Sequence, residues 1–331
     1  MKNNKIRFAV FGTNFISDRF LKASERIPEF QLTAVSGSTI EKARAFAARY
    51  GIDVYFDDAR QLLDAKVADA VYLAVPNSLH FSLTKLFLEH GIPVLCEKPL
   101  ASNSREVSML LDASRQNKTL LMEGIVPLYT PNFHVIQESL GKLGPIRRAV
   151  FNFSKYSSRY DSYRQGIVLN AFKRELSNGS IMDIGIYLLY QAVALFGMPS
   201  ALYARATLLQ SGVDGIGTVV LSYPDKECVL MHSKIVDSAL ENEIQGEDGC
   251  LLIKSFNSPI SITFIPRKGE PVNLTTPQYE EAMFYEIREF IDCMASEKYE
   301  SAIVPHDLIQ SVHTLMDEIR SQTGVVFPSD V

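Results

Sequence analysis

Apolar and polar residues follow two rhythms along the first 122 residues of the chain. Short apolar runs predict strands at residues 6–11, 32–36, 54–56, 70–75, 94–96 and 120–122. Between these runs, apolar residues recur at helical spacing and predict helices near residues 15–27, 40–49, 58–64, 78–90 and 104–117. Strands that alternate with helices are typical of βαβ units. We therefore expect an α/β fold in which residues 1–123 form a Rossmann domain with a doubly wound parallel sheet.

The pattern changes after residue 123, where the strands become longer and alternate between apolar and polar positions. Strand candidates lie at residues 146–153, 201–208, 216–223, 226–235, 240–245, 249–254 and 260–265. Such alternation indicates a sheet with one face in solvent. A helix at residues 181–196 is apolar on nearly every side and should be buried, and two amphipathic helices close the chain. Residues 124–331 are thus predicted to form an α+β domain on a large, mostly antiparallel open sheet.

Composition narrows the classes of partner. Of the 331 residues, 47% are apolar and 21% are charged, and the formal net charge is -5. Without a run of basic residues, the chain has no electrostatic footprint for nucleic acid or an anionic membrane, so a small-molecule partner is expected. The four cysteines and six histidines are scattered, which predicts reduced thiols and no metal site. The N-terminus leads directly into a strand, so we expect no secretory signal and a cytoplasmic protein.

The first strand ends in a glycine turn that opens a helix, which is where a dinucleotide pyrophosphate binds backbone N–H groups. The match to G-x-G-x-x-G is imperfect, because Asn14 and Ser17 occupy the second and third glycine positions. Asparagine tolerates left-handed backbone angles and serine is small, so both replacements are acceptable. An ordinary turn is the alternative. The predicted cofactor contacts here are Gly12, Thr13, Asn14, Phe15 and Ile16.

The end of the second strand indicates which dinucleotide is preferred. A carboxylate there would bind the adenosine ribose of NAD and repel the phosphate of NADP. This chain has Ser36, Ser38 and Thr39 instead, with Lys42 one helical turn beyond Ser38. These residues favour NADP(H) over NAD(H), although serine stands where an arginine usually holds the phosphate. A plain loop with a helix N-cap is the alternative.

Two further strand ends carry candidate chemistry, at Pro76-Asn77-Ser78-Leu79-His80 and at Glu97-Lys98-Pro99. Both should lie at the carboxyl edge of the sheet, where open α/β sheets bind their ligands. Pro99 restricts Lys98 to extended geometry and permits a cis bond, so the lysine would be held in a rigid turn. A lysine held there can bond a substrate hydroxyl and favour its alkoxide. The alternative is a solvated surface lysine.

The three motifs G-x-N-x-I-S, P-N-x-x-H and E-K-P, in this order and spacing, resemble those of the glucose-fructose oxidoreductase / inositol dehydrogenase (Gfo/Idh/MocA) family. The resemblance implies that Lys98 contacts both the nicotinamide ribose and the substrate. It also implies a cofactor cleft lined by Val75, Pro76, Asn77, His80 and Glu97.

The likeness continues in the second domain, where Asn178–Tyr187 resembles the family segment G-G-x-x-x-D-x-G-x-(Y/H). Asp183 and Tyr187 are four residues apart and share one helix face. Tyrosine at the last position is similar to the branch that contains dihydrodiol dehydrogenases and NADP-dependent xylose dehydrogenases. A nearby ammonium from Lys98 would favour the phenolate, so that Tyr187 could take the alcohol proton. Alternatively, Ser180 and Asp183 form a capping box and Tyr187 is a core residue.

Together these features predict an oxidoreductase that transfers a hydride between NAD(P) and a hydroxyl or carbonyl carbon of a sugar, polyol or diol. Its catalytic residues would be Lys98, Asp183 and Tyr187. The alternative is a non-catalytic NAD(P)-sensing regulatory protein of the same fold. Asn178 and Leu128 depart from the family pattern on the substrate side, which leaves the substrate open. The resemblance also implies a homodimer formed through the open face of the second sheet.

Overall fold

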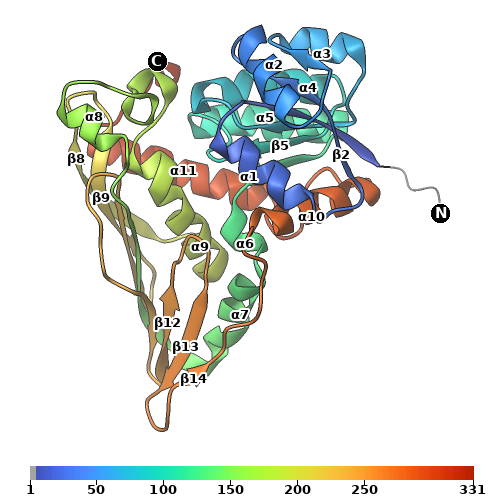
Figure 1. Cartoon of the computed structure of the whole chain (residues 1–331). Coiled ribbons are helices and arrows are strands. Elements are labelled where there is room, and N and C mark those ends of the chain that lie inside the picture. Colours follow the sequence, from blue (N-terminus) through green and yellow to red (C-terminus); the bar gives the residue numbers. More distant parts are fainter. Residues whose placement is uncertain (1–4) are drawn as a thin grey trace. The chain divides into compact units, whose positions relative to one another are not determined.

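The computed structural model describes residues 5–331 and divides them into two compact units (Figure 1). The first unit contains the chain up to Gly124 together with Tyr279–His306, and the second contains Ile125–Gln278 and Asp307–Val331. The chain therefore returns to the first unit late in the sequence. This differs from the sequence prediction, in which everything after residue 123 belongs to the second domain.

The first unit is built on a six-stranded parallel sheet with the order β3-β2-β1-β4-β5-β6. Its strands are β1 (Ile6–Phe11), β2 (Phe30–Ser36), β3 (Tyr55–Phe56), β4 (Ala70–Leu73), β5 (Val94–Glu97) and β6 (Leu121–Gly124). Its helices include α1 (Phe15–Ser24), α2 (Ile40–Arg49), α3 (Ala59–Ala65), the 3-10 turn η1 (Asn77–Leu79), α4 (His80–Glu89) and α5 (Ser104–Asn117). The predicted Rossmann sheet is confirmed, and β1 and β4 meet at the position where the strand order reverses.

The helix α10 (Met283–Ala295) packs against α1 in this unit, and Figure 1 shows the two side by side. Phe290 of α10 lies with its ring 5.7 Å from that of Phe8 in β1. Two surface ion pairs accompany this contact: Lys22 with Glu281 at 2.7 Å and Arg288 with Glu29 at 2.9 Å. The amphipathic stripe predicted for α10 is thus buried against the Rossmann core.

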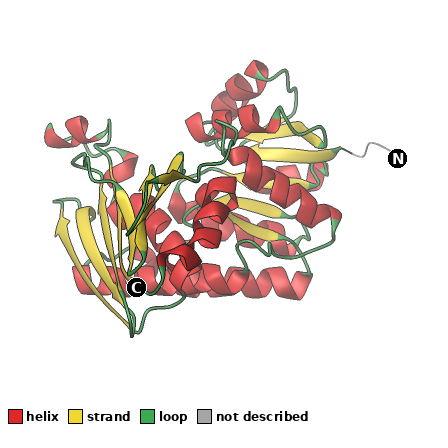
Figure 2. Cartoon of the chain, turned by 90° about the horizontal axis from the view of Figure 1, so that it is seen from below, coloured by secondary structure: helices red, strands yellow, loops and turns green. Residues whose placement is uncertain are grey.

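The second unit contains an eight-stranded sheet with the order β14-β13-β12-β11-β7-β10-β9-β8. Figure 2 draws the strands in yellow. Among the described strands of this sheet, only the pair β7 and β10 is parallel, so the sheet is mostly antiparallel as predicted. The strands are β7 (Ile146–Ser154), β8 (Ala201–Leu208), β9 (Asp214–Ser222), β10 (Glu227–Ser233), β11 (Asn242–Gly246), β12 (Gly249–Lys254), β13 (Ser261–Pro266) and β14 (Val272–Asn273). The pattern did not predict β14, because two residues are too short to show alternation.

One long helical segment packs on this sheet. Ile181–Gly185 form a turn of π-helix that continues as α9 (Ile186–Phe196), and most of its side chains are buried, as predicted. The run Arg174–Phe196 is long and apolar enough to cross a membrane, but 67% of its most apolar window is buried in the fold, as in the core helix of a soluble protein. The other helices are α6 (Val126–Tyr129), α7 (Pro131–Ser139), α8 (Tyr160–Arg164) and α11 (His306–Thr323).

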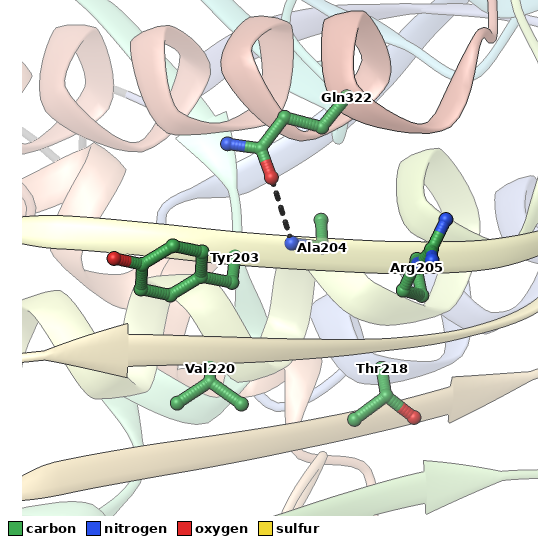
Figure 3. Close-up of a pocket in the computed structure, with 6 residues that line it drawn as sticks. All are labelled: Tyr203, Ala204, Arg205, Thr218, Val220 and Gln322. Atoms are coloured by element: carbon green, nitrogen blue, oxygen red, sulfur yellow. Dashed lines mark hydrogen bonds between the residues drawn. The ribbon is translucent and has the colours of Figure 1, made fainter.

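The β8 edge of the sheet is capped by a side chain of α11. The Gln322 amide accepts a hydrogen bond from the Ala204 N–H at 2.8 Å and donates one to the Leu202 carbonyl at 3.1 Å, so it imitates a neighbouring strand beside β8 (Figure 3). Figure 3 also shows the surface hollow beside this contact. Its lining comprises Tyr203, Ala204, Arg205, Thr218, Val220 and Gln322.

Candidate active site

The turn after β1 requires a glycine at one position. Gly12 has a φ of 106°, and a Cβ at this position would lie 2.2 Å from the carbonyl oxygen of Ala74. The strand end therefore approaches the end of β4 more closely than any side chain would permit. The hydroxyl of Ser17 donates to the Gly12 carbonyl at 2.8 Å, which fixes the small residue at the third motif position.

Asn14 replaces the second motif glycine by a different route from the one predicted. Its backbone is extended, with a φ of -106° and a ψ of 178°, and it serves as the N-cap of α1. The side-chain oxygen accepts from the N–H groups of Ile16 at 2.9 Å and Ser17 at 3.3 Å, and Nδ2 donates to the Ala74 carbonyl at 2.6 Å. The left-handed conformation is taken by Gly12, so tolerance of left-handed angles is not the reason for asparagine at this position.

These contacts fit a bound dinucleotide. The Asn14 side chain already accepts hydrogen bonds from the N–H groups of Ile16 and Ser17. The N–H groups of Thr13, Asn14 and Phe15 come before the first hydrogen bond of the helix, so they would be the ones to meet a pyrophosphate. The Phe15 side chain is 57% exposed beside this turn. An exposed phenyl ring next to this turn would be suited to cover a bound cofactor.

The second strand end combines a cap with a basic group. Ser36 is buried and its carbonyl accepts from the Gly12 N–H at 2.9 Å, whereas Ser38, Thr39 and Lys42 are exposed. The Thr39 hydroxyl caps α2 by accepting from the Lys42 N–H at 3.4 Å. The Lys42 ammonium lies 3.4 Å from the Ser38 hydroxyl. The loop is therefore an N-cap, as the alternative interpretation expects, and it also presents an ammonium and two hydroxyls to solvent.

His80 connects the two strand ends that carry the predicted chemistry. It is 1% exposed, with Nδ1 at 2.7 Å from the Pro99 carbonyl oxygen and Nε2 at 2.9 Å from that of Val75. Burial lowers the pKa of His80, although the two carbonyls favour the charged imidazolium. The ring thus links the segments that follow β4 and β5, while Val75 and Asn77 are half-buried and Pro76 is exposed.

The Glu97-Lys98-Pro99 segment leaves β5 through a cis Lys98-Pro99 peptide bond. Glu97 accepts a hydrogen bond from the Tyr72 hydroxyl at 2.6 Å, while Lys98 is half-buried. Glu286 of α10 is fully buried and lies close enough to Glu97 for the two carboxyl groups to interact electrostatically. Burial raises the pKa of Glu97, and burial together with the charge of Glu97 raises that of Glu286 well above its usual range. The sequence motifs contain no sign of Glu286, because it comes from a helix almost two hundred residues later.

In the second unit, Asp183 and Tyr187 lie across the junction between the π-helical turn and α9. Both are half-buried, and the edge of the Tyr187 ring faces Phe153 of β7 with the centroids 5.9 Å apart. The structure thus places these two predicted catalytic residues on one helical segment, while Lys98 belongs to the first unit. Tyr187 is therefore not enclosed in the core.

Asp183 has an ionic partner that sequence reasoning missed. The ammonium of Lys234, the residue directly after β10, lies 2.9 Å from Asp183 Oδ2. The Ser180 hydroxyl, which a capping box would direct to the helix backbone, instead lies 2.9 Å from His232 Nδ1. The cap is supplied by Asp214 of β9, which accepts from the N–H groups of Ser180 at 3.0 Å and Ile181 at 2.7 Å.

The close approach of Asp214 and His232 explains why two positions of the second-domain motif are glycines. A Cβ on Gly179 would lie 2.2 Å from Asp214 Oδ1, and a Cβ on Gly185 would lie 3.2 Å from the His232 ring. Burial raises the pKa of Asp214 to about 6 and lowers that of His232 to about 4. Near neutral pH, the aspartate is therefore mostly a carboxylate and the histidine is neutral. The polar run His232-Ser233-Lys234 at the end of an apolar strand was the available sequence signal for these partners.

Comparison with known proteins finds relatives along most of the chain. Residues 6–125 match the oxidoreductase family with an NAD-binding Rossmann fold, and residues 139–252 match the Gfo/Idh/MocA C-terminal domain. The chain is 45% identical over 325 residues to scyllo-inositol 2-dehydrogenase (NADP(+)) of Bacillus subtilis. The alignment covers 98% of this chain and 99% of that protein. It is 29% identical to trans-1,2-dihydrobenzene-1,2-diol dehydrogenase of Xenopus laevis, with 97% and 99% covered.

Solved structures show the same fold. A 3-ketoreductase from Actinomadura kijaniata, in complex with NADP, superposes with a TM-score of 0.84 at 23% identity, covering 97% of this chain and 98% of that one. The named relatives are dehydrogenases, which favours an enzyme over the dinucleotide-sensing alternative. With both family models matched and its relatives covered almost end to end, the chain belongs to the Gfo/Idh/MocA family and is an NAD(P)-dependent oxidoreductase that acts on CH–OH groups.

Proposed function

We propose that this enzyme is an NADP(H)-dependent dehydrogenase that interconverts a secondary hydroxyl and a ketone on a cyclic polyol or a related sugar. The observation that carries the cofactor preference is the end of β2, where Ser38, Thr39 and Lys42 present two hydroxyls and an ammonium to solvent. The substrate class is supported by the 45% identity to a relative named as an NADP-dependent scyllo-inositol dehydrogenase.

The chain's own residues have distinct roles in this proposal. When bound, the nicotinamide supplies the hydride acceptor or donor. Gly12, Thr13, Asn14, Phe15 and Ile16 hold the pyrophosphate side of the cofactor, and Val75, Pro76, Asn77 and Glu97 line its cleft, braced by His80. Lys98 donates a hydrogen bond to the reacting hydroxyl and favours its alkoxide. Tyr187 takes the hydroxyl proton, and Asp183 accepts a hydrogen bond from the substrate.

A binding and turnover experiment tests the proposal. The purified protein is titrated with NADPH and NADH by fluorescence, and its turnover is followed by nicotinamide absorbance on inositols, other polyols, sugars and diols. We expect oxidation of a cyclic polyol or sugar with kcat/KM at least about tenfold higher for NADP⁺ than for NAD⁺, a difference of about 1.4 kcal/mol. Equal use of both cofactors would contradict the preference, and turnover of diols alone would contradict the substrate class.

Replacing Ser38 by aspartate should reverse the cofactor preference. The new carboxylate would repel the 2′-phosphate of NADP and accept hydrogen bonds from the ribose hydroxyls of NAD. We expect Ser38→Asp to raise KM for NADP⁺ by roughly tenfold or more and to lower KM for NAD⁺. The matched control is Ser38→Asn, because asparagine has nearly the same shape as aspartate but carries no charge. If both variants changed KM equally, charge at this position would not determine cofactor choice.

Removing the phenol of Tyr187 should affect turnover rather than cofactor binding. Tyr187→Phe keeps the ring contact with Phe153 and removes only the hydroxyl. If Tyr187 is the proton acceptor, kcat should fall by roughly 10²- to 10⁴-fold while the NADPH dissociation constant changes little. An equal loss of turnover and NADPH affinity would assign Tyr187 a structural role.

We also propose a cytoplasmic homodimer. All four cysteines are free thiols, which supports a reducing compartment. The dimer would form on the open face of the large sheet, where cross-strand partners such as Tyr203 with Val220, and Val220 with Val229, form a row of side chains. Tyr203 is 66% exposed on this face, and such an apolar row marks an interaction surface.

A further inference from the structure

Lys234 is a buried lysine in a chain whose other lysines are mostly at the surface. Only 2% of the residue is exposed, and its backbone N–H donates to the Gly215 carbonyl at 2.9 Å, so both the backbone and the side chain are fixed. A buried ammonium is strongly destabilising unless opposite charges and hydrogen-bond acceptors surround it. The surroundings of this ammonium therefore indicate why it is present.

Three groups surround the ammonium. It donates to the Ala171 carbonyl at 2.9 Å, lies 5.2 Å from the centroid of the Phe172 ring, and pairs with Asp183 Oδ2 at 2.9 Å. The charge of Lys234 also acts on the buried Asp214 and lowers its pKa against the effect of burial. The carbonyl and the ring fix the position of the ammonium, and Asp183 is its direct ionic partner.

The two members of the ion pair differ in exposure. Lys234 is enclosed, whereas the Asp183 side chain is 38% exposed, on the helical segment that also carries Tyr187. An ammonium fixed from behind stabilises the ionised form of the carboxylate and restricts its rotation. A carboxylate has about four acceptor positions, so an Asp183 that pairs with Lys234 through Oδ2 can also accept a hydrogen bond from a ligand.

From this geometry we propose that Lys234 is a positioning residue for catalysis: it holds Asp183 as an oriented carboxylate that accepts a hydrogen bond from a substrate hydroxyl next to the one that reacts. The inference rests on the proposed function and deepens it. It implies a substrate with adjacent hydroxyl groups, as in a cyclic polyol or sugar. It also leaves the reacting proton to another group, because Asp183 acts here as an acceptor paired with the ammonium of Lys234.

The test is a double-mutant cycle on the full-length protein with Lys234→Met, Asp183→Asn and the double variant. Methionine keeps the length of the side chain and removes the charge. We expect Lys234→Met to lower kcat/KM for the polyol or sugar by on the order of 100-fold, since a misplaced catalytic contact has an effect of that size. The NADPH dissociation constant should change less than about twofold. In the Asp183→Asn background, the same Lys234→Met substitution should have little further effect.

Controls separate positioning from folding. Lys226→Met removes a lysine at the opposite end of the β9–β10 hairpin, beside Tyr223 and Asp225, and should leave kcat/KM unchanged. Lys234→Arg keeps the charge and should retain more activity than Lys234→Met. If Lys234→Met did not fold, the arginine variant together with Lys234→Gln would complete the comparison.

The outcomes are distinct. Losses from Lys234→Met and Asp183→Asn that simply multiply would overturn the positioning role, as would full activity of Lys234→Met. Urea unfolding of the same four proteins needs no substrate: non-additive stabilities support the ion pair, and additive ones overturn it. If the wild-type protein turned over no polyol or sugar while the stabilities were non-additive, the proposed substrate class would fail and the ion pair would stand.

Discussion

At the residue scale, Asn14 performs two tasks that the usual glycine at this position does not. Its oxygen caps α1, and its amide nitrogen connects the first turn to the end of β4. The helix N-terminus that would hold the pyrophosphate is thereby fixed to the neighbouring strand. Gly12 alone provides the close approach of the backbone.

Asn14→Ala tests this connection. Loss of the cap should reduce the free energy of unfolding by about 1 kcal/mol, with a similar amount for the bond to Ala74. NADPH affinity should fall as well, because the N–H groups of the turn lose their alignment. Urea unfolding and fluorescence titration measure the two effects.

Asn103→Ala is the matched control, since Asn103 caps α5 through the Glu106 N–H at 2.9 Å. It should be destabilising with no change in NADPH affinity. Equal weakening of NADPH binding in both variants would indicate that Asn14 acts only through general stability.

Single residues also show how far the sequence predicts the site. Gly12, Lys98, Asp183 and Tyr187 stand in local motifs, so their spacing alone was informative. Lys234 and Asp214 are absent from those motifs because they come from other strands. Their identity depends on which strands lie beside the helix, and a pattern along the chain does not contain that information.

At the element scale, α10 shows a second limit of the same kind. Its apolar stripe predicted a helix buried on one face, and the structure has that helix at Met283–Ala295. A stripe does not specify which core receives it, and α10 packs on the Rossmann unit rather than in the second domain. The strands were predicted closely, because alternation and apolar runs are local properties.

The buried carboxyl of Glu286 should make stability depend on pH. Its folded-state pKa is raised by burial and by Glu97, so the folded protein keeps a proton that the unfolded chain releases above about pH 4.3. Stability is therefore lost as pH rises toward the folded-state pKa, by up to about 1.4 kcal/mol per pH unit for this group.

Glu286→Gln should accordingly flatten the fall in unfolding free energy between about pH 5 and pH 8, because glutamine carries no titrating proton. Urea unfolding at several pH values measures this slope. Glu280→Gln makes the same charge change at an exposed position and serves as the control. An unchanged slope in Glu286→Gln would mean that the buried carboxyl does not titrate differently on folding.

At the scale of the whole molecule, the open face of the large sheet is the surface on which the proposed dimer depends. Tyr203→Asp places a charge in the row of side chains formed with Val220 and Val229. A charge there would have to be desolvated on association, so we expect the variant to sediment as a monomer. Because Tyr203 is exposed, the unfolding temperature of each subunit should change little. An unaltered dimer would place the interface elsewhere.

The late return of the chain to its first unit has a consequence for biosynthesis. Phe8 of β1 packs against Phe290, and α1 packs against α10. Almost all of the second unit is synthesised after β1 and α1 and before α10. A ribosome therefore exposes an unfinished Rossmann core throughout most of translation. We expect this nascent surface to attract chaperones, and a chain released early, near residue 124, to aggregate instead of binding nucleotide.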